Sequence, residues 1–201
     1  IELANPAARE GILKGMYLLG EGISPRGTTK GGKGSLRVQL LGSGTILRES
    51  IAAAELLSSD WSVTADVWSC TSFTELRREG LDAERWNLLH PTEPRRKSHV
   101  EKCLEGRSGP IVASTDYIKT FADQIRPFIP AGRRYVVLGT DGFGRSDTRE
   151  RLRHHFEVSR HWIVIAALKA LADDGQLAPS KVSEAVAKYG IDPDKPNPVT
   201  V

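Results

Sequence analysis

The fold is decided by the stretch Val38–Thr45 (VQLLGSGT), in which a short apolar run, Val38–Leu41, meets a glycine turn, Gly42–Thr45. The next residues are amphipathic, because Leu47, Ile51 and Ala54 follow the i, i+4, i+7 spacing of one helix face. A strand, a tight turn and a covering helix make one β–α unit of a layered fold.

Further units of the same kind lie on both sides of this stretch. Three more apolar runs predict strands at Val63–Cys70, Pro110–Ala113 and Tyr135–Leu138, and Ile12–Leu19 predicts a first strand that lies antiparallel on an edge. Helices are predicted from a capping box (Ser98, Glu101) to near Gly106, along Ile118, Ala122 and Ile125 until Pro127, around Trp162–Leu171, and around Val182–Tyr189. The alternation indicates a three-layer α/β/α domain with a mostly parallel sheet.

Length and composition restrict the class of protein. A chain of 201 residues and 22.0 kDa fits one domain, and 28 basic against 25 acidic residues give a net charge of +3, too balanced to indicate a nucleic-acid or membrane partner. No apolar run approaches the roughly 20 residues of a membrane span. Two cysteines, Cys70 and Cys103, make no disulfide scaffold, so the cytoplasm is the expected compartment.

Two segments are expected to lack regular structure, and the first residue suggests a longer precursor. Residues 20–35 contain six glycines and predict a flexible loop, while the proline-rich residues 191–201 predict an extended tail. Because the chain begins with Ile1, we expect it to be a processed product or a piece of a longer protein.

Polar segments follow each predicted strand, and ligands of open α/β sheets gather at such carboxyl ends. Gly42–Thr45 is either an anion-binding turn or a purely structural one, since it lacks the third glycine of a dinucleotide fingerprint and the lysine of a P-loop. The segment Asp141–Arg153 is either a site for an acidic substrate or partner, or a structural turn followed by a salt-bridged helix, which Ser146 or Thr148 can cap. The candidate interface residues are Asp141, Phe143, Gly144, Arg145, Ser146, His154 and His155.

The sequence offers no catalytic or metal-binding motif. The five histidines have no metal-ligand spacing, the cysteines form no C-x-x-C pair, and no G-x-S-x-G nucleophile elbow is present. The residues therefore nominate no catalytic, cofactor-binding or metal-binding position. Arg95–Lys97 is interpreted as a solvated loop, and the four tryptophans as core or interface anchors.

Seven stretches, taken in order and spacing, resemble the C-terminal domain of homodimeric-type pyruvate dehydrogenases, the thiamine-diphosphate-dependent first component of the pyruvate dehydrogenase complex. They are Val38–Gly44, Thr71–Leu76, Glu84–Pro91, Ala113–Tyr117, Leu138–Asp147, Leu152–Val158 and Asp194–Pro198. More distantly, the layout is similar to the C-terminal domain of transketolases. This similarity implies one domain over residues 1–201 and a five-stranded mixed sheet with one antiparallel edge strand.

The resemblance also implies a division of labour. In that family thiamine diphosphate and Mg²⁺ lie between an N-terminal and a middle domain, which this chain lacks, so no catalytic residue is transferred to it. The full enzyme would decarboxylate pyruvate and reductively acetylate a lipoyl group of dihydrolipoyl acetyltransferase, with the cofactor supplying the chemistry. The implied role of these residues is architectural: packing against the missing domains and contributing to a homodimer.

Two other classes of function remain open on the residues alone. A free-standing α/β module that binds a small anion through its strand-end loops would have affinity for phosphate or nucleotide. An independent hydrolase or transferase would turn over substrate without further domains.

Overall fold

A computed structural model describes residues 6–24, 27–28 and 36–201 and shows one mixed sheet in the order β2-β1-β4-β3-β5-β6. Strands β3, β4, β5 and β6 are parallel, whereas β1 is antiparallel to β4. The short β2 pairs only with the last two residues of β1. The strands are β1 (Met16–Ser24), β2 (Gly27–Thr28), β3 (Arg37–Gly42), β4 (Thr64–Cys70), β5 (Ile111–Ser114) and β6 (Tyr135–Leu138). The predicted five-stranded mixed sheet with one antiparallel strand is confirmed, and β2 is added at its margin.

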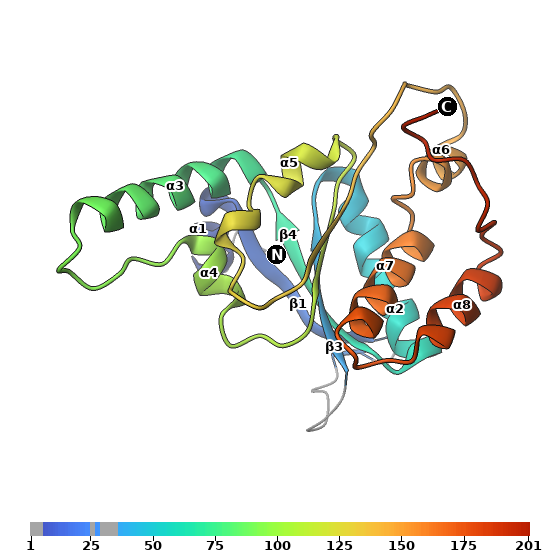
Figure 1. Cartoon of the computed structure of the whole chain (residues 1–201), viewed down its shortest axis with the longest axis horizontal. Coiled ribbons are helices and arrows are strands. Elements are labelled where there is room, and N and C mark those ends of the chain that lie inside the picture. Colours follow the sequence, from blue (N-terminus) through green and yellow to red (C-terminus); the bar gives the residue numbers. More distant parts are fainter. Residues whose placement is uncertain (1–5, 25–26, 29–35) are drawn as a thin grey trace.

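Helices cover both faces of the sheet (Figure 1). One face carries α2 (Leu47–Trp61), α7 (Arg160–Asp173) and α8 (Pro179–Lys188), and the other carries α1 (Pro6–Lys14), α3 (Phe73–Leu89), α4 (His99–Leu104) and α5 (Lys119–Asp123). The remaining elements are α6 (Arg149–His155) and the 3₁₀ turns η2 (Gly44–Ile46) and η3 (Arg126–Phe128). The predicted three-layer α/β/α arrangement is therefore confirmed.

Strand β4 shows why both faces need a cover. Its side chains alternate between two hydrophobic cores: Ala65 and Val67 pack beneath α2 and α7, while Trp68 and Cys70 pack on the opposite face. All four are buried, as expected for a central strand of a doubly covered sheet.

The prediction of a strand at Ile12–Leu19 is wrong at its start. Residues 12–14 close helix α1, in which Ala8 and Ile12 are one helical turn apart and Leu13 is 76% exposed. The strand instead continues to Ser24, so residues 20–24 are not loop as predicted. Gly20 coincides with register shifts against β4, because glycine in a strand marks a bulge as readily as a loop. The rest of the predicted loop, apart from residues 27–28, lies outside the described residues.

Two helical predictions also need correction. The 17-residue helix α3 is absent from the sequence prediction, because its buried positions include the small residues Gly80 and Ala83, which give a weak apolar pattern. Gly80 packs directly against the ring of Phe128. The predicted helix along Ile118–Ile125 is split into α5 and η3, and Pro127 lies inside the first turn of η3, where proline is tolerated.

The capping box before α4 forms as predicted. Ser98 Oγ accepts a hydrogen bond from Glu101 N (3.1 Å), and the Glu101 carboxylate accepts one from Ser98 N (2.8 Å). Helix α4 ends at Leu104. In the tail, residues 191–201 contain no helix or strand, and Ile191 and Pro198 are buried.

A buried carboxylate ties the antiparallel strand to the parallel part of the sheet. Asp66 of β4 is fully buried and accepts hydrogen bonds from Arg37, from Gln39 Nε2 (2.8 Å) and from Gly22 N (3.0 Å). Arg107 lies 3.6 Å away. Because its partners come from β1, β3 and the loop before β5, Asp66 fixes the amino edge of the parallel strands.

No helix in the described part of the chain is long and apolar enough to cross a membrane.

Replacing Asp66 should therefore destabilise the whole sheet. We expect Asp66→Ala to lower the free energy of unfolding in urea by about 3–5 kcal/mol, since it leaves the arginine charges without their buried partner. Amide exchange of Gly22, which loses its acceptor, should accelerate. The exposed Asp82→Ala in α3 should change stability by no more than about 0.5 kcal/mol. Equal effects of the two substitutions would contradict this role of Asp66.

Candidate functional site

The loops at the carboxyl edge of the sheet are joined to one another by side-chain hydrogen bonds. Ser43 Oγ donates to Thr115 Oγ1 (2.9 Å), and Thr45 Oγ1 donates to the Asp116 carboxylate (3.1 Å). Thr140 Oγ1 donates to the backbone carbonyl of Asp116 (2.8 Å). The polar side chains of Gly42–Thr45 thus point to the neighbouring loop, and their hydrogen bonds hold the two loops together.

The turn Asp141–Asp147 is held at its base and exposed at its tip. Asp141 Oδ1 accepts a hydrogen bond from Lys119 N (3.1 Å). Gly142 has φ +109°, and a Cβ there would lie 2.3 Å from the carbonyl oxygen of Pro198, so only glycine fits. Phe143 is 79% exposed. The loop therefore presents its aromatic tip to solvent on a base fixed by α5 and the tail.

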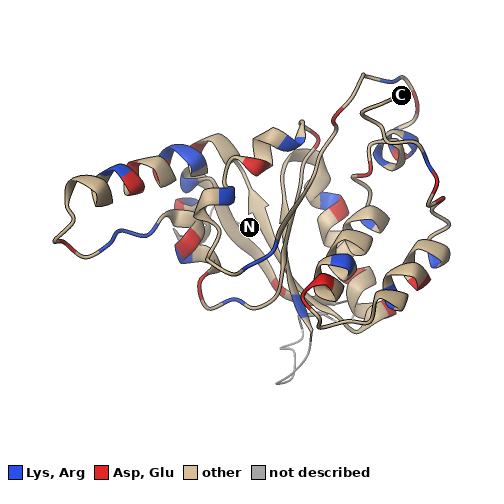
Figure 2. Cartoon of the chain, viewed as in Figure 1, with Lys and Arg blue, Asp and Glu red and all other residues tan. Residues whose placement is uncertain are grey.

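Helix α6 follows this turn and carries the basic residues seen at the upper right of Figure 2. Its N-cap is Thr148, whose Oγ1 accepts from Arg151 N (3.4 Å), so of the two predicted caps Thr148 is used and Ser146 is not. Ser146 and Gly144 are exposed.

The two adjacent histidines of α6 point to different surroundings. His154 is exposed and lies beside the ring of Trp162, with centroids 6.1 Å apart. His155 packs edge-on against Phe156. Burial, helped by the charge of Lys195, lowers the pKa of His155. The candidate residues therefore do not converge on one point: Gly144 and Arg145 border one groove, His154 borders another, and His155 faces the tail.

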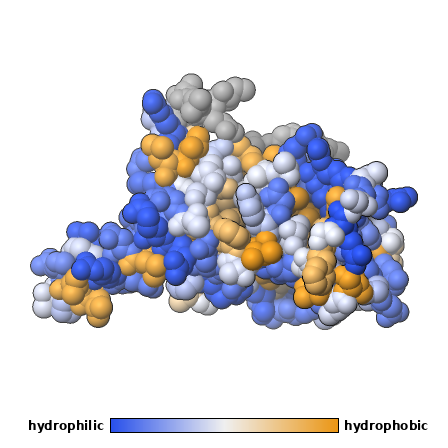
Figure 3. Space-filling model, turned by 90° about the horizontal axis from the view of Figure 1, so that it is seen from above, coloured by the Kyte–Doolittle hydropathy of each residue, from blue (hydrophilic) through white to orange (hydrophobic). Residues whose placement is uncertain are grey.

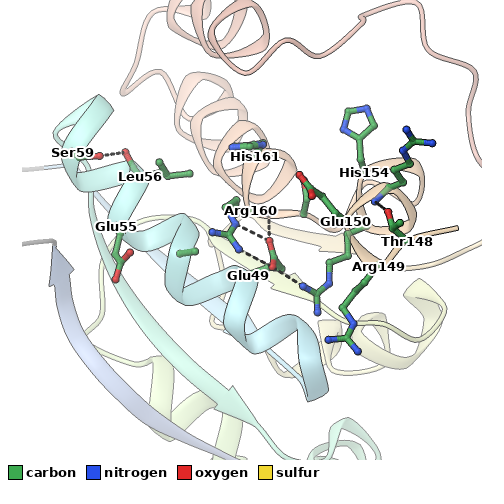
Figure 4. A pocket seen from close by; sticks show the side chains of 14 residues that line it. Glu49, Glu55, Leu56, Ser59, Thr148, Arg149, Glu150, His154, Arg160 and His161 are labelled. Atoms are coloured by element: carbon green, nitrogen blue, oxygen red, sulfur yellow. Dashed lines mark hydrogen bonds and ion pairs between the residues drawn. The ribbon is translucent and has the colours of Figure 1, made fainter.

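A buried glutamate in α2, Glu49, is not among the residues that the sequence nominated. The Glu49 side chain is 5% exposed. Its carboxylate accepts hydrogen bonds from Arg153 Nη1 (2.8 Å), from Arg160 Nε (3.0 Å) and from the backbone N–H of Arg160 (3.0 Å) (Figure 4). Burial opposes the charge on this carboxylate, but the hydrogen bonds from Arg160 and the charges of Arg160 and Arg153 outweigh it and lower the pKa of Glu49. Glu49 precedes the buried Ala53 by four residues, and this spacing in the sequence indicates that the two side chains lie on the same buried face of α2.

Glu49 lies at the floor of a groove of about 1140 Å³ between α2, α6 and the start of α7. The groove mixes charges, since Glu55 and Glu150 line it together with Arg149, Arg151 and His154 (Figure 4). Such a lining suits a polypeptide surface better than a small ion of one sign.

Within residues 6–24, 27–28 and 36–201, no group of three or more histidine, cysteine, aspartate or glutamate side chains is placed to hold a metal ion. Burial also raises the pKa of Cys70 above its ordinary range and that of Cys103 to about 11, which keeps both thiols protonated and poorly nucleophilic. The described residues thus provide no cluster of these side chains for the metal of a metal–diphosphate site.

Loss of the Glu49 carboxylate should loosen α6 and α7 from α2. We expect Glu49→Ala to lower the free energy of unfolding by about 3 kcal/mol, because two arginines lose their shared buried partner. Because the folded pKa of Glu49 is lowered, its contribution is present above the ordinary carboxyl pKa and disappears as the pH falls through the folded value.

Urea unfolding at several pH values checks both expectations. The native chain should lose more stability on acidification than Glu49→Gln, which has no charge to neutralise. Glu55→Ala, an exposed change in the same helix, serves as the control and should stay within about 0.5 kcal/mol of the native chain. A Glu49→Gln variant with an unchanged acid dependence would refute the pH argument.

Comparisons with known proteins agree with this architecture. The family model of the transketolase-like TK C-terminal domain matches residues 26–159. The pyruvate dehydrogenase E1 component of Cupriavidus necator is 62% identical over 190 residues, covering 94% of this chain and 20% of the relative. That of Pseudomonas aeruginosa is 58% identical over 192 residues, covering 96% and 21%. The chain thus spans about a fifth of the length of the curated relatives it matches.

Solved structures show the same fold at low sequence identity. Transketolase from Campylobacter jejuni superimposes with a TM-score of 0.50 and 17% identity, covering 78% of this chain and 18% of that one. A Pichia stipitis transketolase has a TM-score of 0.50 and 17% identity, covering 84% and 19%. From the family match over most of its residues and the shared fold, the chain belongs to the transketolase-like C-terminal domain family.

Proposed function

We propose that this chain is the C-terminal domain of a pyruvate dehydrogenase E1 component, and that its role there is architectural. The observation that carries the proposal is the 62% identity to the Cupriavidus necator relative over 94% of the chain. The longer enzyme, called the parent below, decarboxylates pyruvate with thiamine diphosphate and Mg²⁺ and transfers the acetyl group to a lipoyl group of dihydrolipoyl acetyltransferase. The cofactor supplies the electron sink for that chemistry.

In this proposal the residues of the chain bind and orient neighbouring parts of the parent. The turn Asp141–Asp147, with His154 and His155, meets the N-terminal and middle domains or the second subunit of a cytoplasmic homodimer. Phe143 supports such a contact, since a large exposed aromatic side chain on a fixed loop is a good interface anchor. The isolated chain is inactive and binds no thiamine diphosphate.

Calorimetric titration of thiamine diphosphate and Mg²⁺ tests the cofactor part of this proposal. We expect saturable heat with the full-length parent and none with the 201-residue chain, because the described residues contain no group of histidine, cysteine, aspartate or glutamate side chains placed to hold the metal. Saturable binding by the chain would contradict the architectural role.

Alanine substitutions in the turn test the contact. In the parent, Phe143→Ala or Arg145→Ala should remove more than about 1 kcal/mol from the docking of this domain, as expected for an interface anchor. At roughly 2–4 °C per kcal/mol, this appears as a lower thermal transition. In the isolated chain both side chains are exposed, so the same substitutions should change stability by less than about 0.5 kcal/mol. Unchanged stability, dimerisation and activity of the parent would remove the turn from the interface.

A further inference from the structure

Exposed apolar side chains are concentrated at the carboxyl edge of the sheet. In the described part of the chain, four large exposed ones belong to α1 and α3, and all the others come from three segments at this edge. Figure 3 looks onto the edge from above and shows apolar residues interspersed with polar ones. The edge residues are Tyr117, Ile118, Phe121, Phe143, Val199 and Val201.

Backbone contacts make these three segments one surface. Thr140 N donates to the carbonyl of Tyr117 (2.9 Å), and Gly142 lies against Pro198. The rings of Tyr117 and Phe121 lie 5.1 Å apart. We call residues 117–121, 139–147 and 197–201 the edge platform. Because its segments contact one another, its apolar side chains are presented together.

A groove of about 500 Å³ continues the edge platform toward α6. Its floor is apolar, formed by Ile46, Leu152 and Phe156, and its rim carries Arg145 and Arg149. Apolar side chains of a partner can enter such a groove while its charged groups stay at the rim.

Positive charge is in excess among the unpaired groups of this groove. Among the described residues Arg145 and Arg149 have no ion-pair partner, whereas of the two acidic residues of the rim only Asp116 lacks one. Asp116 accepts from Thr45, and Asp147 accepts from Thr148 N (2.7 Å) and lies 3.9 Å from Arg151. A partner that complements the groove must therefore supply carboxylates.

We propose that the edge platform and its groove bind an apolar segment flanked by carboxylates, contributed by a part of the parent outside these 201 residues. This inference rests on the proposed function and names the chemistry of the occupant. The segment inserts an apolar side chain over Leu152 and Phe156 and pairs its carboxylates with Arg145 and Arg149, a geometry to which guanidinium groups are suited.

The same charges argue against a second copy of this surface as the occupant. Two edge platforms face to face would bring Arg145 and Arg149 of each copy together, and the one unpaired carboxylate of each copy, Asp116, would offset only part of this charge. Glu150, which has no ion pair in the described chain, points to the other side of α6, toward Arg160 and His161 (Figure 4). Relatives about five times as long contain ample chain to provide the segment.

Photo-crosslinking in the full-length parent tests this inference. With p-benzoylphenylalanine in place of Phe143, peptide mass spectrometry should find a crosslink to a segment outside these 201 residues that carries aspartate or glutamate beside apolar residues. Arg149→Glu should reduce the yield about tenfold, the factor expected for loss of one modest charge pair. The probe at the exposed Ser183 of α8 should give no such product, and Arg85→Glu in α3 should leave the yield unchanged.

Each other result overturns the inference. A crosslink to the edge platform of a second copy would replace the proposed occupant, and a crosslink to a segment without carboxylates, or none, would remove it. A yield unaffected by Arg149→Glu would exclude the charge pairing. Pyruvate-dependent acetyl transfer by the unsubstituted parent is measured separately, so its absence would contradict the proposed function without altering what the crosslink reports.

Discussion

The arrangement of the carboxyl edge depends on the ion pairs that Glu49 makes inside the protein. This carboxylate lies in the first turn of α2, yet both arginines that neutralise it come from more than a hundred residues further along the chain, Arg153 in α6 and Arg160 at the start of α7. Removing one partner of a buried ion pair lowers the stability of the fold by more than the net contribution of the pair, because it leaves the other charge without a partner. Glu49 thereby holds α6 in place, and with α6 the turn Asp141–Asp147 that precedes it.

Asp66 plays the matching part at the amino edge of the parallel strands. It accepts hydrogen bonds from Arg37 and Gln39 of β3 and from Gly22 of β1. Asp66 therefore links the antiparallel strand β1 to the parallel strands. Between Asp66 and Glu49, each face of the sheet carries its own hydrophobic core. A rigid sheet anchored at both ends is a suitable base for loops that must keep one shape while contacting other domains.

The surface chemistry agrees with an architectural role in a larger enzyme. The described residues present fixed loops, exposed aromatic side chains and unpaired arginines, and they contain no cluster of metal-ligating side chains. Exposed aromatic side chains and unpaired arginines are common in binding surfaces. The chain belongs to the transketolase-like C-terminal domain family, which explains the arrangement of its strands and helices. In the proposed parent, other parts of the enzyme would cover the apolar side chains that are exposed at the carboxyl edge of the sheet.

Local patterns in the sequence determined the elements whose signals are short-range: the β–α unit at Val38–Ala54, the capping box of Ser98 and Glu101, and the strand at Tyr135–Leu138. They did not determine α3, whose packing uses Gly80 against Phe128, nor the strand that continues through Gly20, because glycine has no apolar signal of its own. The turn at Asp141–Asp147 could be nominated from its glycines, but Glu49 could not be paired with Arg153 and Arg160. Residues separated by more than a hundred positions meet only when the sheet brings α2, α6 and α7 together, and that was decided by the tertiary structure.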